Sequence, residues 1–471
     1  MRAISILVAG CVLAAFSISC TYKGHDRVCT NKSLPQAGVL HTIACTDNPG
    51  RSYALYVPPL QTPQGSGKNG KQFYPVIIAF DPHGDGKLPL SLYKELADKF
   101  GFIMMGSMDA KNGLPQEEVR EIVAALIKEV FTVYPVDTNR IYFLGFSGGA
   151  RVATMAAMYQ VPVKGVIGCG AGFGGGDQPI RYKFDYFGIA GTADFNMSEL
   201  LELDEPLSHA GVRHVITAFP GKHEWPPVEE MDEAFSWITL NAMRDGMIKK
   251  DDAFISNLMN TFNSRIEMLT AKNQLIAAAD ACREAVVFIT GLGSAEKWKS
   301  ELISLEMKPA YQSQVAYRNN VLKKEGEEKQ QLMQALQSKD LSWWKEWIRS
   351  HAAHVTRHEN INPEDTLKDR RLLAFLSLYC YMNANAALAK QNEDAAIKII
   401  AIYEMADAPN AEPNYMRAIL FARRTEYDHA IDQLKIAASK GFSDKQRLSV
   451  QPEFLAMQSS PAWIDLLKSI K

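Results

Sequence analysis

The stretch Ile141-Tyr-Phe-Leu-Gly-Phe-Ser-Gly-Gly-Ala-Arg-Val-Ala153 joins an apolar run to a series of small residues through a glycine-rich turn. The apolar run predicts a buried strand over 140–146, and the residues after the turn predict a helix over 148–159. The glycines around Ser147 permit a tight, strained backbone turn that exposes the serine hydroxyl. Ser147 is therefore either a nucleophile or one residue of a simple glycine turn, and the rest of the chain decides between the two.

Apolar runs alternate with amphipathic stretches on both sides of this turn, from about residue 51 to residue 245. The predicted strands are Tyr53–Val57, Val76–Asp81, Phe102–Ser107, Arg140–Phe146, Gly165–Gly170, Tyr186–Gly191 and His214–Phe219. The predicted helices between them include Leu92–Phe100, Glu117–Tyr134, Ala150–Tyr159 and Glu229–Met243. Strands that alternate with helices predict an α/β fold, in which a mostly parallel sheet is covered by helices on both faces.

Two residues after later strands supply what a serine nucleophile needs. A serine requires a general base, and the base requires an acid that orients it. Asp194 directly follows one predicted strand, and His223 follows the next. Asp177 and Glu199 are other carboxylates that could take the place of Asp194. Because parallel strands end at the same edge of a sheet, we expect Ser147, Asp194 and His223 to meet there.

An oxyanion hole needs two backbone N–H groups near the serine. The residue after the nucleophile, Gly148, supplies one of them. The loop Asp81–Gly86 follows an earlier predicted strand, and the N–H of Asp85 is the expected second donor because a glycine before it frees the backbone. His83 and Trp225 are expected to border the substrate site. The main role of His83 is expected to be structural, in the loop, and that of Trp225 to be packing.

Together these features resemble the α/β-hydrolase superfamily, and within it compact, lidless esterases similar to dienelactone hydrolases and polyhydroxybutyrate depolymerase-like esterases. The resemblance covers roughly residues 51–243 and is carried by Phe80–Gly86, Gly145–Gly149, Gly191–Asp194 and Gly221–Pro226. It implies Ser147 as nucleophile, His223 as general base and then acid, and Asp194 as the orienting acid. It also implies hydrolysis of a small-molecule or polymer ester through an acyl-enzyme, without a metal or organic cofactor.

The composition is that of an ordinary globular protein. The chain has 471 residues, of which 47% are apolar and 22% charged, a length that allows more than one domain. Its 51 Lys and Arg residues nearly balance its 53 Asp and Glu residues, which gives a formal net charge of −2. With no basic run and no zinc-finger spacing, we do not expect nucleic acid as a partner.

Residues 1–19 are predicted to be a secretory signal peptide. Arg2 gives a positive start, and Ile4–Ile18 is almost entirely apolar or small but too short to span a membrane. A small residue precedes Cys20, which resembles a bacterial lipoprotein signal, so we expect Cys20 to be lipidated, with simple secretion as the alternative. We therefore expect an exported, periplasmic or outer-membrane lipoprotein held by its lipid anchor, with residues 20–50 as a linker and no later transmembrane run.

The cysteines leave one pairing open. Cys29 and Cys45 flank a polar segment of an exported chain, so they form either a disulfide or two free thiols. The other cysteines of the mature chain are isolated in apolar surroundings and are expected to be buried. No C-x-x-C spacing is present, so no zinc site is expected.

Residues 246–471 have helical periodicity and no predicted strand. The segments 392–396 and 426–430 align, and Ala396 and Ala430 lie 34 residues apart. This period, near residues 370–445, resembles tetratricopeptide repeats, with a generic helical bundle as the alternative. Such arrays present a concave surface to a protein or peptide. Two alternatives to an esterase therefore stay open: a serine peptidase on the same triad, and a binding scaffold with an inert hydrolase half.

Two clusters of side chains lie upstream of these repeats. Three imidazoles share one face of a predicted helix at His351, His354 and His358. With no carboxylate or cysteine partner evident in the sequence, we expect a solvated polar face rather than a metal site. A stripe of aromatic residues is expected to pack between helices rather than to stack on sugar rings, and consists of Trp343, Trp344 and Trp347.

Overall fold

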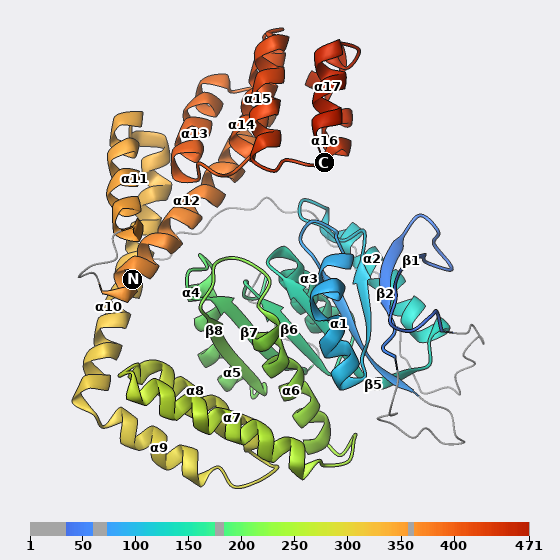
Figure 1. Cartoon of the computed structure of the whole chain (residues 1–471), viewed down its shortest axis with the longest axis vertical. Helices are drawn as coiled ribbons and strands as arrows, with labels where there is room; N and C mark the ends of the chain where they lie inside the picture. The colour runs from blue at the N-terminus through green and yellow to red at the C-terminus, as the bar shows by residue number, and fades with distance from the viewer. Residues whose placement is uncertain (1–33, 60–72, 175–182, 357–361, 471) are drawn as a thin grey trace, which may run out of the picture.

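The structure is a computed structural model that describes residues 34–59, 73–174, 183–356 and 362–470 (Figure 1). The predicted signal peptide lies outside these residues. So do four residues that the sequence analysis singles out, namely Cys20, Cys29, Asp177 and His358. The predictions that concern them therefore stay predictions.

One mixed sheet forms the centre of the first half, with the strand order β1-β2-β4-β3-β5-β6-β7-β8. Its strands are β1 (Leu40–Ala44), β2 (Ser52–Tyr56), β3 (Tyr74–Phe80), β4 (Ile103–Ser107), β5 (Val136–Phe146), β6 (Gly165–Cys169), β7 (Asp185–Gly191) and β8 (His214–Phe219). The strands from β3 to β8 run parallel, while β2 pairs antiparallel with β4 and with β1. Each predicted strand is confirmed within a few residues. The edge strand β1 was missed because it is short and none of its side chains is fully buried.

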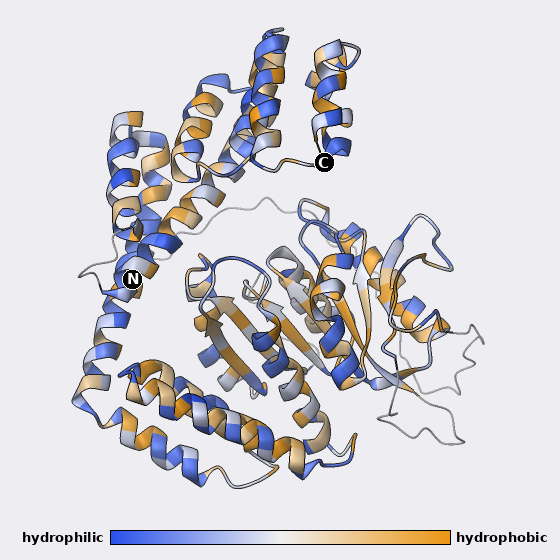
Figure 2. Cartoon of the chain, in the orientation of Figure 1, coloured by the Kyte–Doolittle hydropathy of each residue, from blue (hydrophilic) through white to orange (hydrophobic). Residues whose placement is uncertain are grey.

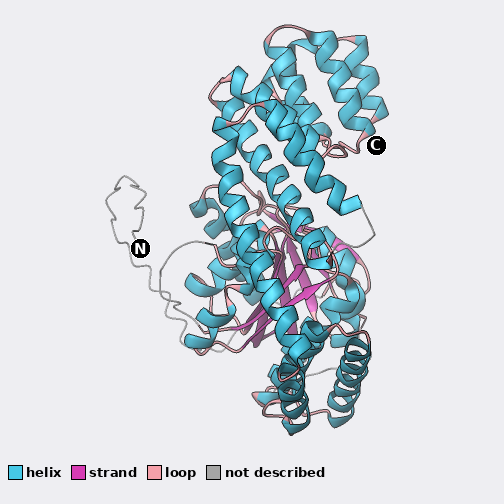
Figure 3. Ribbon diagram, turned by 90° about the vertical axis from the view of Figure 1, so that its left-hand side faces the viewer, coloured by secondary structure: helices cyan, strands magenta, loops and turns pink. Residues whose placement is uncertain are grey.

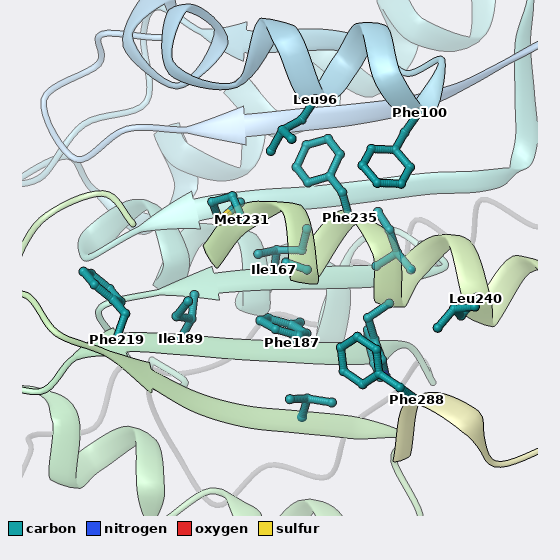
Figure 4. Packing of buried hydrophobic residues seen from close by; sticks show 14 of the residues in the cluster. Leu96, Phe100, Ile167, Phe187, Ile189, Phe219, Met231, Phe235, Leu240 and Phe288 are labelled. Atoms are coloured by element: carbon teal, nitrogen blue, oxygen red, sulfur yellow. The ribbon is translucent and has the colours of Figure 1, made fainter. Parts of the chain in front are cut away.

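Helices cover both faces of this sheet. On β3, the neighbouring residues Ile77 and Ile78 point to opposite faces and join different apolar clusters. The Ile77 face is covered by α1 (Lys87–Phe100) and α6 (Val228–Arg244), as Figure 4 shows for Phe100, Phe187 and Phe235. The Ile78 face is covered by α2 (Gln116–Val133), α3 (Gly148–Tyr159) and the short helices α4 (Met197–Leu201) and α5 (Asp204–His209). A mixed sheet covered in this way fits an α/β-hydrolase fold.

The apolar core of the first half continues past residue 245, where the sequence analysis placed a domain boundary. Three helices follow: α7 (Asp252–Ala271), α8 (Leu275–Ile289) and α9 (Glu296–Glu306). Phe262 of α7 and Phe288 of α8 belong to the same buried cluster as Phe235 of α6. Figure 2 shows the strands mostly in the hydrophobic colour and these outer helices with both colours, as one-sided burial requires. The three helices therefore form an extra layer on the sheet domain.

A second core lies in the remaining helices. The long helix α10 (Pro309–Ser338) leads from the extra layer to a separate helical group at the other end of the molecule (Figure 3). This group contains α11 (Leu341–Thr356), α12 (Pro363–Ala389), α13 (Glu393–Ala406), α14 (Glu412–Arg423), α15 (Tyr427–Ser439), α16 (Lys445–Val450), the 3-10 helix η2 (Pro452–Met457) and α17 (Pro461–Ser469). Trp344 is fully buried in its core, with Trp343 and Trp347 packed against it. The packing predicted for the tryptophans is confirmed.

The 34-residue spacing of the sequence has a counterpart in the helix pairs. Between α12 and α13 the turn residue Gln391 has a φ of 55°, and between α14 and α15 Thr425 has a φ of 60°. The two small residues of the pattern, Ala396 and Ala430, are both fully buried. Consecutive helix pairs are thus built alike, and their assignment as tetratricopeptide repeats stays a prediction.

By length and hydropathy alone, one helix of the described residues is able to cross a membrane, contrary to our expectation. This helix is α12, which packs against α10, α11, α13 and α14. It also carries Asp369 and Arg371, both almost completely buried within the protein. Its buried apolar residues, such as Leu372 and Leu376, belong to the second core.

Two glycines provide a test of the packing. A Cβ at Gly106 of β4 would lie 1.9 Å from the carbonyl oxygen of Gly86, at the start of α1. We expect Gly106→Ala to lower the free energy of unfolding by about 2 kcal/mol, because a backbone must move. Gly326, in the exposed middle of α10, has no atom within 4 Å of such a Cβ. Gly326→Ala should raise stability by about 0.5–1 kcal/mol through helix propensity, measured by chemical denaturation. Equal stabilities of the two variants would contradict the close approach.

Candidate active site

The glycine-rich turn places Ser147 between β5 and α3 in a strained conformation. Ser147 has a φ of 52° and a ψ of −119°, which is rare for a residue with a side chain. Its N–H donates to the carbonyl of Cys169 on β6 at 2.8 Å. A Cβ at Gly149 would lie 2.0 Å from the carbonyl oxygen of Phe80, so only glycine allows α3 to start this close to β3. The turn thus fixes the serine at the carboxyl edge of the sheet.

The structure brings the three predicted catalytic residues together. Nε2 of His223 lies 2.9 Å from Oγ of Ser147, and Nδ1 of His223 lies 2.9 Å from Oδ2 of Asp194. Asp194 is completely buried, and its other carboxylate oxygen accepts the N–H of Asn196 at 2.8 Å. Because an ionised carboxylate only accepts, Nδ1 carries the proton and Nε2 is free to accept the serine proton. The arrangement is that of a serine, a histidine that can act as its base, and an acid that orients the histidine.

Two aromatic rings that the sequence analysis missed hold the imidazole. The ring of Phe146 lies 4.7 Å from the His223 ring, and the ring of Phe195 lies 4.3 Å from it. Each residue is a direct neighbour of a triad member, Phe146 of Ser147 and Phe195 of Asp194. Their positions next to Ser147 and Asp194 in the sequence could have indicated that they lie close to the imidazole. Packing between them restricts the imidazole to the orientation that both hydrogen bonds need.

The expected oxyanion loop lies beside the serine, and its base is tied down by Asp81. This buried carboxylate accepts the N–H of His83 at 2.8 Å and the indole N–H of Trp225 at 3.0 Å. Burial alone would raise the pKa of Asp81, but hydrogen bonds from His83 and Trp225 outweigh it and hold that pKa below its usual range. Within the described part of the chain, no group accepts a hydrogen bond from the N–H of Gly148 or Asp85. Both remain available as donors.

Trp225 and His83 have different surroundings. The Trp225 ring packs on Phe146 at 5.4 Å and on Tyr93 at 6.0 Å, so its place is in the wall of the site. The His83 side chain is 83% exposed. The hydrogen bond and the negative charge of Asp81 raise the pKa of its imidazole and outweigh the opposing effect of desolvation. His83 is therefore the one of the two that solvent or substrate reaches freely.

A polar residue next to Gly148 was not predicted. Asn112 lies in the loop after β4, and its N–H donates to the carbonyl of Pro82 at 2.8 Å. Its side-chain oxygen is so close to Gly148 that a Cβ there would lie 1.8 Å from it. Its place in the loop that follows the carboxyl end of a parallel strand was the available signal. Asn112 thus places an amide beside the expected oxyanion hole.

The structure also bears on the predictions for Glu199 and Cys45. Glu199 forms a two-point ion pair with Arg151 at 2.7 and 2.8 Å, so it is not the acid that orients His223. Cys45 is buried and forms no disulfide with another cysteine of the described residues, and burial raises the pKa of its thiol to about 11, while the choice between a disulfide to Cys29 and a free thiol stays open. Its expected partner Cys29 lies outside the described residues.

The two imidazoles of α11 differ: the His351 side chain is only 14% exposed, which corrects the prediction of a solvated face there, whereas the His354 side chain is 52% exposed, as predicted. His351 contacts Glu328 at 3.3 Å, and His354 contacts Asp369 at 2.8 Å. Burial alone would lower the pKa of His351, but the Glu328 hydrogen bond helps to raise it. The carboxylate partners come from α10 and α12, at sequence distances where no local pattern reveals them. Among the described residues, no group of histidine, cysteine or carboxylate side chains is arranged to hold a metal ion.

Comparison with known proteins adds little beyond this geometry. No protein-family model and no curated protein matches the chain. Among solved structures, the S-formylglutathione hydrolase FrmB of Staphylococcus aureus is 12% identical, with a TM-score of 0.35, over 44% of this chain and 99% of its own. An esterase from Pyrobaculum calidifontis is 14% identical, with a TM-score of 0.34, over 45% of this chain and 87% of its own. A putative dienelactone hydrolase from Klebsiella pneumoniae is 15% identical, with a TM-score of 0.32, over 43% and 97%. The fold therefore rests on the strand order and the site geometry.

A pair of variants separates the two carboxylates near the triad. Asp194→Asn should lower the rate of Ser147 modification by a fluorophosphonate about 10³–10⁴-fold, because the amide can donate to Nδ1 and stabilise the wrong tautomer. Glu199→Gln should change that rate by less than about threefold, since Glu199 pairs with Arg151. The second-order inactivation rate measures both. A larger effect of the Glu199 variant would overturn the assignment of the acid.

Proposed function

We propose that this chain is an exported, lipid-anchored serine hydrolase that cleaves carboxylic esters. The observation that carries the proposal is the hydrogen-bonded series Ser147, His223 and Asp194, with 2.9 Å at each step, on a strained strand-to-helix turn. The N–H groups of Gly148 and Asp85, which have no acceptor among the described residues, support it, because acyl transfer needs donors for the oxyanion.

The proposed reaction follows from these positions. The Ser147 oxygen attacks the ester carbonyl carbon while Nε2 of His223 takes its proton. The carbonyl oxygen becomes an oxyanion and accepts hydrogen bonds from the N–H groups of Gly148 and Asp85. The C–O bond to the alcohol then breaks, His223 protonates the leaving alkoxide, and an acyl-enzyme remains. A water that loses its proton to His223 attacks this acyl group, which releases the acid and restores Ser147.

The surroundings of the site bear on the substrate. No acidic or basic side chain other than the triad's own lies at the Ser147 hydroxyl among the hydrogen bonds of the described residues, so recognition of a charged acyl group has no evident partner there. The exposed Asp85 carboxylate, near the expected oxyanion hole, disfavours an anionic substrate. A neutral small or polymeric ester fits these charges best.

The predicted reactivity of Ser147 has a direct test. A fluorophosphonate probe should label the purified wild-type chain at Ser147, located by mass spectrometry of peptides. Ser147→Ala and His223→Ala should both lose the label, because the first lacks the nucleophile and the second its base. Ser350→Ala, which changes an exposed serine of α11, should keep it. Folded wild-type protein that takes up no label would refute the serine hydrolase proposal.

A substrate panel then distinguishes the alternatives. Turnover of acetyl, short-chain and aryl esters without cleavage of peptides is the expected result. Cleavage of peptides by the same serine would convert the proposal into a serine peptidase. A binding partner retained by Ser147→Ala, in a chain that takes up no probe, would support a scaffold.

Lipid anchoring is tested separately, in cells that express the full chain. The wild-type protein should incorporate a clickable fatty acid and sediment with membranes, because acyl chains on Cys20 partition into lipid. Cys20→Ala should lose both properties, and Cys45→Ala, which changes a buried thiol, should lose neither. A Cys20→Ala protein that still carries the fatty acid would contradict the proposed anchor.

A further inference from the structure

We propose that the helical half positions the triad acid, through Arg371 and Lys329, and that catalysis depends on this connection. The inference rests on the proposed function. It concerns the segment Gly191–Asn196, which follows β7 and carries Asp194; we refer to it as the acid loop.

Both cations donate hydrogen bonds to backbone carbonyls on either side of Asp194. Nη1 of Arg371, on α12, lies 2.7 Å from the carbonyl oxygen of Thr192. Nζ of Lys329, on α10, lies 2.9 Å from the carbonyl oxygen of Phe195. The acid is thus held between two points that belong to helices more than a hundred residues further along the chain.

A third residue joins the two cations to each other. Glu325 of α10 is 1% exposed: its Oε2 accepts a hydrogen bond from Nε of Arg371 at 2.7 Å, and its Oε1 forms an ion pair with Nζ of Lys329 at 2.8 Å. One carboxylate balances only one of the two positive charges. Each cation also donates to a carbonyl of the acid loop, so the three side chains and the loop form one connected polar group.

Buried charges of this kind are poorly explained by stability alone. Removing an ion pair from water costs several kcal/mol per ion, and a pair of apolar side chains of similar size often stabilises a protein as well or better. Arg371 is fully buried and the Lys329 side chain is 15% exposed, while the core of the helical group consists mainly of apolar residues. Apolar side chains cannot donate hydrogen bonds to the two carbonyls of the acid loop, whereas Arg371 and Lys329 do so.

The acid loop has two tasks that depend on its position. It presents Asp194 to His223, and it places the Phe195 ring 4.3 Å from the His223 ring. A shift of the loop would therefore move both the partner and the support of the general base. Because misplacement of a catalytic group by about 1 Å can cost about a hundredfold in rate, this connection is expected to matter for turnover. Arg371 and Lys329 touch no reacting atom, so they act as positioning residues.

The proposal is tested on the purified full chain, with p-nitrophenyl acetate as the ester. The double variant Glu325→Leu/Arg371→Met removes the bond to Thr192 together with one charge of each sign, so the net charge of the cluster is unchanged, and Lys329, whose side chain is 15% exposed, keeps its bond to Phe195. Lys329→Met removes only the bond to Phe195 and its share of the Glu325 carboxylate. We expect kcat to fall about tenfold or more in the double variant and less in Lys329→Met, while KM stays within about twofold, because orientation of the base acts in the transition state.

A conservative variant and a matched control exclude a general structural effect. Arg371→Lys keeps the charge and should restore part of kcat. The control is Glu453→Leu/Arg423→Met, since Arg423 pairs with Glu453 at 2.8 Å and donates to the carbonyl of Leu388 at 2.8 Å, all within the helical group. The control should keep the wild-type kcat, with thermal unfolding showing that both double variants are folded.

A second readout keeps this test separate from that of the proposed function. The hydrogen bond between Nδ1 of His223 and Asp194 should give a far-downfield proton resonance, assigned by its loss in His223→Ala. It should shift or broaden in the connection variants and not in the control, even if no ester is turned over. A folded double variant with unchanged kcat and an unchanged resonance would overturn the proposal, as would equal losses in the double variant and the control.

Discussion

The approach of α3 to β3 is the constraint on which the site depends. The chain turns from β5 into α3 within one residue, and Gly149 then passes against the carbonyl of Phe80 at a distance that no Cβ would tolerate. Gly145 and Gly149 are likewise in contact with each other. This contact leaves Ser147 no relaxed conformation, so its positive φ follows from the packing of helix on sheet. The strain is sustained because β5 lies in the middle of the sheet, paired on both sides.

From that fixed point, the parallel order of the strands assembles the rest. The acid follows β7, the histidine follows β8 and the oxyanion loop follows β3, so their loops converge at one edge. Contacts between the loops then make the edge rigid. The buried Asp81 ties the base of the oxyanion loop to Trp225, two residues after His223. The aromatic rings of Phe146 and Phe195 enclose the imidazole from the serine and acid sides. The imidazole of His223 is therefore held by residues that adjoin Ser147 and Asp194 in the sequence.

The sequence was informative where the signal is local. Strand, turn and helix around Ser147, and the positions of Asp194 and His223 after strands, depend on residues next to one another, and the structure brings these three together. Long-range pairing gives no such signal. Glu325 and Arg371 are 46 residues apart on different helices, and nothing in either segment marks them as partners. His351 was assigned to a solvated face for the same reason, because its carboxylate Glu328 belongs to another helix. The core past residue 245 was missed because helical periodicity identifies an apolar face but not what it packs on.

The polar character of the contact between the two halves has a consequence for the role of the helices. An apolar interface would tolerate small displacements with a gradual loss of contact, whereas hydrogen bonds to the carbonyls of Thr192 and Phe195 are made only within a narrow range of distance and angle. The two cations come from α10 and α12, and α12 also packs in the helix pairs that carry the 34-residue spacing. A change in the angle between these helices would therefore change the position of Asp194 before it changed the packing of the sheet domain's core. The helical group thus has a physical route to the candidate active site through these two hydrogen bonds.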